Sequence, residues 1–177
     1  MIEIRIHGRG GQGSVKASEV LSEAAFMDGK YTRASPFTGT EIRGASVEAY
    51  CRISDEEIKT REFIYNPDYI LVLDSSLLND SKTLEGLKNN SIIILNSSDG
   101  KKISLKIKNK VYSIDLTKIA LEIIGKTFVN TPMLGAFVAV SNIVSLKSLL
   151  DVINKKFDDK NAKAAEVAYN RMKEIMK

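Results

Sequence analysis

The sequence predicts a single α/β domain in which a mostly parallel sheet carries helices on both faces and a small hairpin. Strand-like apolar segments alternate with segments of helical spacing along the chain of 177 residues. The segment 69–74 is apolar up to its final Asp74, as expected of a central parallel strand whose two faces are covered. Because the chain has no internal repeat, linker or low-complexity tract, we expect one domain spanning residues 1–177.

The first half of the chain supplies most of the predicted strands. Ile2, Ile4 and Ile6 alternate with polar residues and indicate a first strand. A helix is expected over residues 14–27, ending at Asp28-Gly29, because glycine is a common left-handed stop. A second parallel strand over 31–34, a loop over 35–44 and further strands over 45–53 and 69–74 complete this half.

The second half is richer in helices. Residues 77–87 are expected to be helical and 91–95 to form another strand. Two short apolar segments, 103–107 and 111–114, flank Asn109 and predict the hairpin. Helices are then expected over residues 116–124, 133–144, 146–157 and 161–176, the last one rich in lysine and alanine and facing solvent.

Composition excludes several classes of protein. The only cysteine, Cys51, cannot form an intrachain disulfide or hold an iron–sulfur cluster, and a single histidine, His7, excludes a His-rich metal site. The charged N-terminal strand is no signal peptide, and the most apolar window, 132–144, is too short to span a membrane, so we expect a cytoplasmic location and no membrane partner. The 26 basic and 22 acidic residues are interspersed, and we expect no nucleic-acid partner.

The sharpest local signal lies between the first strand and the first helix, in the segment Gly8-Arg9-Gly10-Gly11-Gln12-Gly13. Four glycines in six residues let backbone N–H groups approach a ligand, and the following helix start favours an anion. A glycine-rich turn without a ligand is the other interpretation, and it stays open. His7, next to this segment, is better explained as a core or loop residue than as a catalyst.

Two named phosphate motifs fit this segment only in part. Gly8, Gly10 and Gly13 match the G-x-G-x-x-G dinucleotide fingerprint, but no carboxylate follows the second strand, where a ribose hydroxyl would be held. Ser14-Val15 stands where a P-loop requires Lys and Ser or Thr, so hydrolysis of a nucleoside triphosphate is not expected. The missing carboxylate after the second strand also disfavours a nicotinamide dehydrogenase.

A second candidate segment follows the second strand and carries Glu41, Arg43 and Gly44. Loops at the carboxyl ends of parallel strands are where open α/β sheets place their ligands. Glu41 and Arg43 either pair with each other or reach a partner chain or an anionic ligand, since guanidinium presents a planar fork to phosphate and carboxylate.

The two glycine motifs together resemble the gamma subunits of the 2-oxoacid:ferredoxin oxidoreductases, most closely the pyruvate branch. The resemblance rests on the segments 7–13 and 37–45, the latter reading Phe-x-Gly-x-Glu-x-Arg-Gly-Ala. Weaker matches are Asn66-Pro-Asp68 and Asn130-Thr-Pro-Met-Leu-Gly135, and the likeness covers nearly the whole chain. Departures from the family pattern at Thr40, Ile42 and Ser46 leave the particular 2-oxoacid open, 2-oxoisovalerate included.

The resemblance implies a Rossmann-like domain in an enzyme that joins a 2-oxoacid to coenzyme A, releases carbon dioxide and reduces ferredoxin. Thiamine diphosphate, Mg²⁺ and iron–sulfur clusters are then expected on alpha, beta and delta partner subunits. This chain lacks the family's Gly-Asp-Gly and Asn-Asn pattern for thiamine diphosphate, and we assign it no catalytic residue and no metal ligand. The alternative is a free-standing nucleotide- or coenzyme-binding module.

In the family setting, the glycine segment is expected to contact coenzyme A or a partner surface at the entrance of the active site. The expected cofactor-binding residues are Gly8, Arg9, Gly10, Gly11, Gln12, Gly13, Glu41, Arg43 and Gly44.

Overall fold

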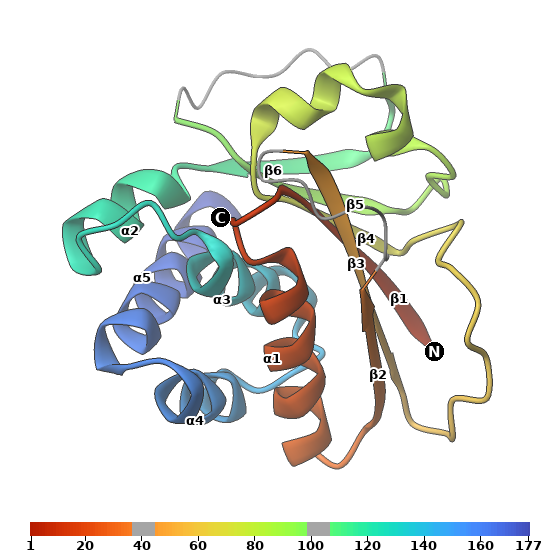
Figure 1. The fold of residues 1–177 in the computed structure, drawn as a ribbon, viewed down its shortest axis with the longest axis horizontal. Helices are drawn as coiled ribbons and strands as arrows, with labels where there is room; N and C mark the ends of the chain where they lie inside the picture. The colour runs from red at the N-terminus through yellow and green to blue at the C-terminus, as the bar shows by residue number, and fades with distance from the viewer. Residues whose placement is uncertain (37–44, 99–106) are drawn as a thin grey trace.

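The computed structural model describes residues 1–36, 45–98 and 107–177, and it contains one six-stranded sheet with the order β2-β3-β1-β4-β5-β6 (Figure 1). The strands are β1 (Ile2–Arg9), β2 (Tyr31–Pro36), β3 (Ser46–Ser54), β4 (Tyr69–Val72), β5 (Ile92–Asn96) and β6 (Lys110–Ile114). β4 lies at the centre of the parallel part, between β1 and β5, as its apolar sequence predicts. The α/β class and the mostly parallel sheet are therefore confirmed.

One strand runs against the others. β1, β4, β5 and β6 pair in parallel, whereas β3 pairs antiparallel with both β1 and β2. Since β2 and β1 are each antiparallel to β3, they point in the same direction. The carboxyl end of β2 therefore lies at the same edge of the sheet as those of β1 and β4, where an open α/β sheet binds ligands.

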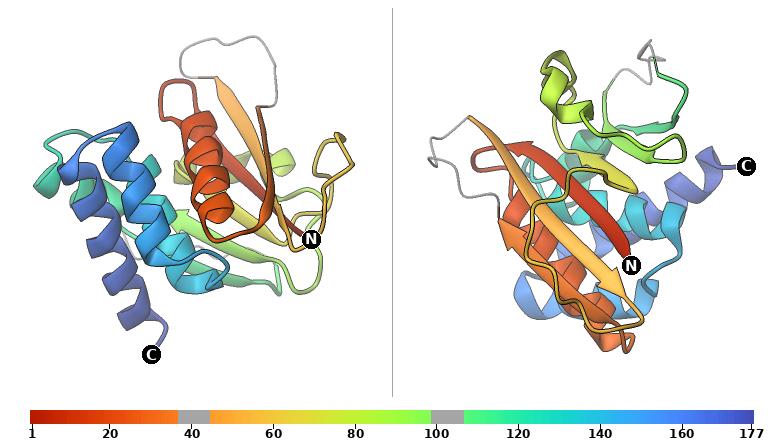
Figure 2. Two further views of the ribbon diagram at one scale, coloured as in Figure 1. Left: turned by 90° about the horizontal axis from the view of Figure 1, so that it is seen from below. Right: turned by 90° about the vertical axis from the view of Figure 1, so that its right-hand side faces the viewer.

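All five α-helices contribute to one apolar core on one face of the sheet (Figures 1 and 2). They are α1 (Ser14–Met27), α2 (Leu116–Ile123), α3 (Asn130–Ser141), α4 (Leu146–Lys156) and α5 (Asp159–Ile175). Within β4 the alternation of the strand directs Leu71 into this core and Ile70 and Val72 into a smaller one on the opposite face.

On the opposite face of the sheet, short 3₁₀ helices cover β4 and β5. Instead of the single helix expected over residues 77–87, the chain forms η1 (Ser75–Asn79) and η2 (Ser81–Leu84). Asp74 and Asp80 each accept a hydrogen bond from the backbone N–H two residues later, so each carboxylate starts a new turn, and the turn at Asp80 interrupts the expected helix. The expected helices on both faces are thus α-helices on one face and 3₁₀ helices on the other.

The predicted hairpin is not found among the described residues. Its second arm is β6, which pairs in parallel with β5, and most of its first arm falls within 99–106, outside the described residues. A hairpin requires antiparallel strands, whereas β6 pairs in parallel with β5. Apolar alternation predicts a strand, but it does not specify the partner of that strand or the direction of the pairing.

The C-terminal helix α5 packs its alanine face into the core against α3. Ala164, Ala165 and Ala168 are fully buried, so only the lysine-rich side of α5 meets solvent as predicted. A Cβ on Gly135 of α3 would overlap the backbone carbonyl of Ala165, which shows how closely the two helices approach. In the described parts of the chain, no helix has the length and apolar character needed to cross a membrane.

Candidate functional site

The glycine segment forms the turn from β1 into α1 at the carboxyl edge of the sheet (Figure 1). Gly11 and Gly13 have φ values of 93° and 83°, a region that side chains other than that of glycine rarely adopt. The N–H of Gly10 donates to the carbonyl of Ala45 at 2.8 Å, which ties the turn to the residue before β3. The sequence therefore encodes this turn through its glycines, as predicted.

One side of the turn is fastened to the end of β4, and we call it the Asp74 side (Arg9, Gln12, Asp74 and Ser76). Arg9 Nε and Gln12 Nε2 donate to Asp74 Oδ2 at 3.2 and 3.3 Å. Arg9 Nη2 also donates to Ser76 Oγ at 2.7 Å, and Gln12 Oε1 accepts from the Arg9 N–H at 2.7 Å. The two polar side chains of the glycine segment are thus engaged within the protein.

The charge of Asp74 holds this arrangement together. Burial raises the pKa of the Asp74 carboxyl, but hydrogen bonds from Ser76 and Gln12 and the charge of Arg9 outweigh that effect and lower the pKa below its ordinary value. Asp74 is therefore ionised at neutral pH and accepts from both side chains of the turn.

The other side of the turn opens into a cavity of about 520 Å³, and we call it the Asn130 side. The cavity lies among the starts of α1, α3 and α5 and beside the segment that follows α2. Its lining residues are Gly11, Gln12, Gly13, Ile124, Lys126, Phe128, Asn130, Phe157, Asp158, Lys160 and Asn161. Three helix starts therefore meet the C-terminal ends of α2 at Ile124 and of α4 at Phe157 in this cavity, so helix dipoles of both signs act on it.

Asn130 is the polar residue at the back of this cavity. The residue as a whole is 8% exposed, but its amide is not among the buried side-chain groups that lack a hydrogen-bond partner, so the amide is open to the cavity. A Cβ on Gly13 would lie 2.6 Å from Asn130 Nδ2, so only glycine lets the start of α1 approach the start of α3 so closely. The chain therefore places a side-chain amide that is open to the cavity directly beside the turn.

The charged groups at the mouth of the cavity are two lysines and one aspartate. Lys126 and Lys160 are exposed, and Lys126 Nζ lies 5.7 Å from the centre of the Phe128 ring. Asp158 caps α5, because its Oδ1 accepts from the N–H and Nδ2 of Asn161 at 2.9 and 2.8 Å. These hydrogen bonds lower the pKa of Asp158, so its negative charge persists beside the lysines.

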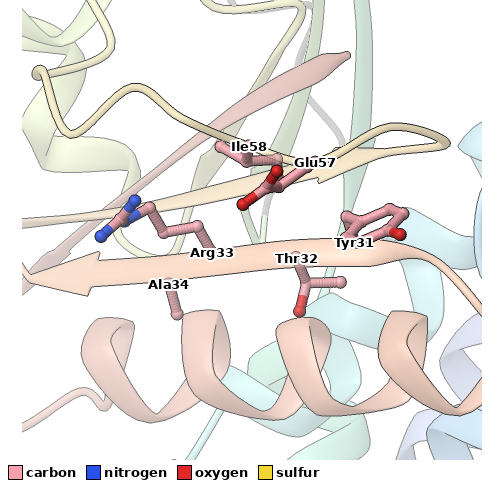
Figure 3. A pocket seen from close by; sticks show the side chains of 6 residues that line it. All are labelled: Tyr31, Thr32, Arg33, Ala34, Glu57 and Ile58. Carbon is pink, nitrogen blue, oxygen red and sulfur yellow. The ribbon is translucent and has the colours of Figure 1, made fainter.

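A second cavity, of about 460 Å³, lies along the edge strand β2 (Figure 3). Figure 3 shows Thr32 and Ala34 pointing toward α1, while Tyr31 and Arg33 point to the other face of the strand, near the segment of Glu57 and Ile58. Because these side chains diverge from one another, they do not form a set of groups directed at one ligand.

His7, beside the turn, and Cys51, in the middle of β3, are both buried. His7 is 1% exposed, and burial, followed by the charge of Arg5, lowers its pKa to about 3, so the imidazole is neutral. Its Nδ1 lies 3.7 Å from Glu48 Oε1. Burial raises the pKa of Cys51 to about 12, which makes the thiol unreactive. Both residues are buried in the protein, and for His7 this agrees with the prediction.

The structure brings the predicted residues Gly8, Arg9, Gly10, Gly11, Gln12 and Gly13 together in the one turn. Glu41, Arg43 and Gly44 lie outside the described residues, so their predicted roles stay predictions.

Sequence reasoning missed Lys126, Lys160 and Asn161. On the Asn130 side, the one sequence feature that stood out was the motif beginning at Asn130. That motif indicates a resemblance to the family, but it did not predict the cavity. Across the described residues, no group of three or more His, Cys, Asp or Glu side chains could hold a metal ion.

Fold and site together define a Rossmann-like α/β subunit whose glycine turn faces a cavity at the carboxyl edge of the sheet. The family described as pyruvate ferredoxin/flavodoxin oxidoreductase matches residues 3–171. The chain belongs to this family and is a gamma-type subunit of an oxidoreductase complex.

Named relatives are similar to this chain along almost its full length. The chain is 49% identical to pyruvate synthase subunit PorC of Methanothermobacter marburgensis over 98% of both chains. It is 46% identical to the pyruvate/ketoisovalerate oxidoreductases common subunit gamma of Thermococcus kodakarensis over 97% of both.

Solved structures show the same fold. The crystal structure of pyruvate oxidoreductase subunit PORC from Thermotoga maritima has a TM-score of 0.83 and 37% identity, covering 98% of this chain and 95% of that one. A 2-oxoglutarate:ferredoxin oxidoreductase from Magnetococcus marinus shares the fold alone, with a TM-score of 0.78 and 19% identity. The match covers 98% of this chain and 30% of that longer chain.

Proposed function

We propose that this chain is the gamma subunit of a pyruvate:ferredoxin oxidoreductase, which converts pyruvate, coenzyme A and oxidised ferredoxin into acetyl-coenzyme A, carbon dioxide and reduced ferredoxin. The observation that supports this most strongly is 49% identity to a PorC subunit over 98% of both chains. Alpha, beta and delta subunits then carry thiamine diphosphate, Mg²⁺ and the iron–sulfur clusters, because this chain has one cysteine and no thiamine motif.

A second candidate follows from a particular relative. The gamma subunit of Thermococcus kodakarensis, 46% identical, is named as common to pyruvate and ketoisovalerate oxidoreductases. On that basis, one gamma chain would assemble with two sets of partners and serve two 2-oxoacids. The departures at Thr40, Ile42 and Ser46 fit either candidate.

Within the complex, the glycine turn forms part of the entrance for coenzyme A. The turn lies at the carboxyl edge of the sheet and joins a cavity with two lysines, which suits a ligand with several phosphates. Replacing Arg9 and Gln12 with alanine releases the turn from Asp74, and we expect the apparent requirement for coenzyme A to rise. An unchanged requirement in the intact complex would contradict this role.

The experiment that tests the subunit assignment is anaerobic affinity purification of the tagged chain from its own cells. We expect three stoichiometric partners with a thiamine motif and cysteine-rich cluster motifs, and dye reduction that depends on both coenzyme A and pyruvate. Dye reduction with 2-oxoisovalerate by a second set of partners supports the shared-subunit candidate. Elution of the chain alone, as a monomer or homodimer, would refute both and favour a free-standing coenzyme-binding module.

A further inference from the structure

The edge strand β2 is the least covered strand of the sheet. Among the strands that the structure describes, β2 stands at one end of the sheet order and pairs only with β3. None of its residues 31–35 is buried, whereas each of the other strands contains at least two buried residues. Alternate backbone N–H and C=O groups of an edge strand point away from its neighbour, so β2 offers hydrogen-bonding groups along its free side.

A cavity of about 460 Å³ lies along β2 (Figure 3). Its lining residues are the four consecutive residues 31–34 of β2, together with Glu57 and Ile58 from the segment after β3. The four β2 side chains diverge to the two faces of the strand, so what they share at the cavity is their backbone. Four residues of a strand span about 13 Å, at ~3.3 Å per residue, and this length accommodates four residues of an added strand.

Two exposed aromatic side chains flank the same edge. Ser22 Oγ of α1 donates to Thr32 Oγ1 of β2 at 2.9 Å, so this side of α1 faces β2. Phe26 lies one turn after Ser22 on the same side of the helix, and it is 69% exposed. Tyr31, the first residue of β2, is 53% exposed. A partner that covers these two rings removes apolar surface from water, which favours association.

The charged residues of this edge are directed toward the chain itself. Arg33 Nη1 donates to the carbonyl of Thr60 at 3.2 Å, and Lys30 forms an ion pair with Asp55. At the opposite end of the sheet order, β6 begins with the exposed Lys110. Exposed lysines commonly protect edge strands against pairing with other chains. The β6 edge has this protection, whereas the β2 edge is left able to pair.

We infer that an extended segment of a partner subunit pairs with β2 and continues the sheet, with apolar side chains that cover Phe26 and Tyr31. Partner subunits exist because this chain is a gamma-type subunit of an oxidoreductase complex. The inference rests on the proposed function for the identity of that complex, and it assigns the surface through which this chain joins it.

A second copy of this chain fits the edge less well than a different subunit. Two β2 strands that pair about a two-fold axis perpendicular to the sheet place equivalent side chains on the same face. In the registers centred on residue 32, 33 or 34, Arg33 lies directly or diagonally opposite Arg33 of the second copy. Like charges directly opposite are destabilising, and diagonal neighbours stay within reach of a long side chain. A partner segment with a neutral or acidic residue at this position avoids the repulsion.

The first test is hydrogen exchange at the backbone N–H groups of the full-length chain, alone and within the purified complex. Assembly should slow the exchange of the outward-facing N–H groups among residues 31–35 by about tenfold or more, a change of ~1.4 kcal/mol or more. The matched control is residues 110–114 of β6, whose exchange should not change. Unchanged exchange over 31–35 in a complex that contains the partner subunits, or equal slowing at both edges, would overturn the inference while leaving the proposed function intact.

The second test changes the two aromatic side chains. Phe26→Lys with Tyr31→Lys gives this edge the lysines that it lacks, and we expect the dissociation constant between the chain and the remaining subunits to rise by about tenfold. Leu121→Lys on α2, a residue that is 50% exposed, is the control and should leave that constant unchanged. Equal constants for the double variant and the control would contradict the inference.

Two further outcomes separate the inference from its alternatives. If exchange over residues 31–35 slows with rising concentration of the chain alone, a second copy occupies the edge, and the inference is wrong while the proposed function stands. Elution of the chain without partner subunits refutes the proposed function and the inference together.

Discussion

The two sides of the glycine turn treat their polar groups in opposite ways. On the Asp74 side, Arg9 and Gln12 both donate to one carboxylate, which in turn starts the 3₁₀ helix η1. On the Asn130 side, the side-chain amide of Asn130 is open to a cavity. The first side fixes the shape of the turn, and the second leaves groups available for binding.

This difference teaches that charged and polar residues within a motif are not automatically its binding residues. Arg9 and Gln12 stand inside the glycine motif, yet both side chains donate hydrogen bonds to Asp74 of the same chain. Apart from Gly11, Gln12 and Gly13 themselves, the residues that line the cavity lie more than 100 residues later in the sequence. Substitutions that act on one side and not on the other separate these roles.

The largest effect is expected where α3 and α5 approach each other, because this contact builds the Asn130 side. Gly135→Ala places a Cβ against the backbone carbonyl of Ala165, which cannot move without separating the two helices. We expect a loss of about 3 kcal/mol in the free energy of unfolding, measured with urea. The control Asn154→Ala, on the exposed surface of α4, should stay within ~0.5 kcal/mol of the unmodified chain. Equal values for the two variants would contradict the close approach.

A smaller effect is expected in the turn itself, and it distinguishes neighbouring glycines. Gly13→Ala must adopt a φ of 83° and also displaces the Asn130 amide, which lies 2.6 Å from the new Cβ. Gly11→Ala adopts a φ of 93° with no atom within 4 Å of its Cβ. We expect losses of about 2 kcal/mol and about 1 kcal/mol, respectively, in urea unfolding. Equal losses would show that Gly13 is required for its conformation only, and not for the approach of Asn130.

Most of the fold follows from local pattern, as three elements illustrate. The alternation in β1, the helical spacing of α1 with its stop at Asp28-Gly29, and the apolar β4 are all found where predicted. The antiparallel placement of β3 was not predicted, because alternation defines a strand but not the direction of its neighbours. The interruption at Asp80 was missed because apolar spacing over 77–87 hides the effect of two capping carboxylates.

The site was predictable only on one side of the turn. Glycine spacing predicts the turn between β1 and α1, since few other residues adopt its φ values. The cavity depends on Lys126, Asn130 and Lys160, which lie 34 residues apart at most and share no motif. They meet because Gly135 and the alanines of α5 let two helices pack closely, which is a tertiary effect.

The smallest effect is expected on the Asp74 side, and its sign depends on pH. The pKa of Asp74 is lowered in the folded chain, so the carboxylate contributes stability above its ordinary pKa of about 3.9, and this contribution is lost as the pH falls through the folded value. Asp74→Asn should therefore cost about 1 kcal/mol at pH 7, discounted for the partial exposure of Asp74, and less at pH 3, which lies below the ordinary pKa. Urea unfolding at both pH values measures the difference.

The matched control for Asp74→Asn is Asp28→Asn at the other end of α1. Burial raises the pKa of Asp28, but hydrogen bonds from Ser145 and Ser148 outweigh this and lower it, so its stability contribution depends on pH in the same direction. Asp28 does not contact the glycine turn, because it joins the end of α1 to the start of α4. Only Asp74→Asn should therefore raise the KM for coenzyme A in the complex. If both variants raise it equally, general destabilisation, and not the fastening of Arg9 and Gln12, accounts for the change.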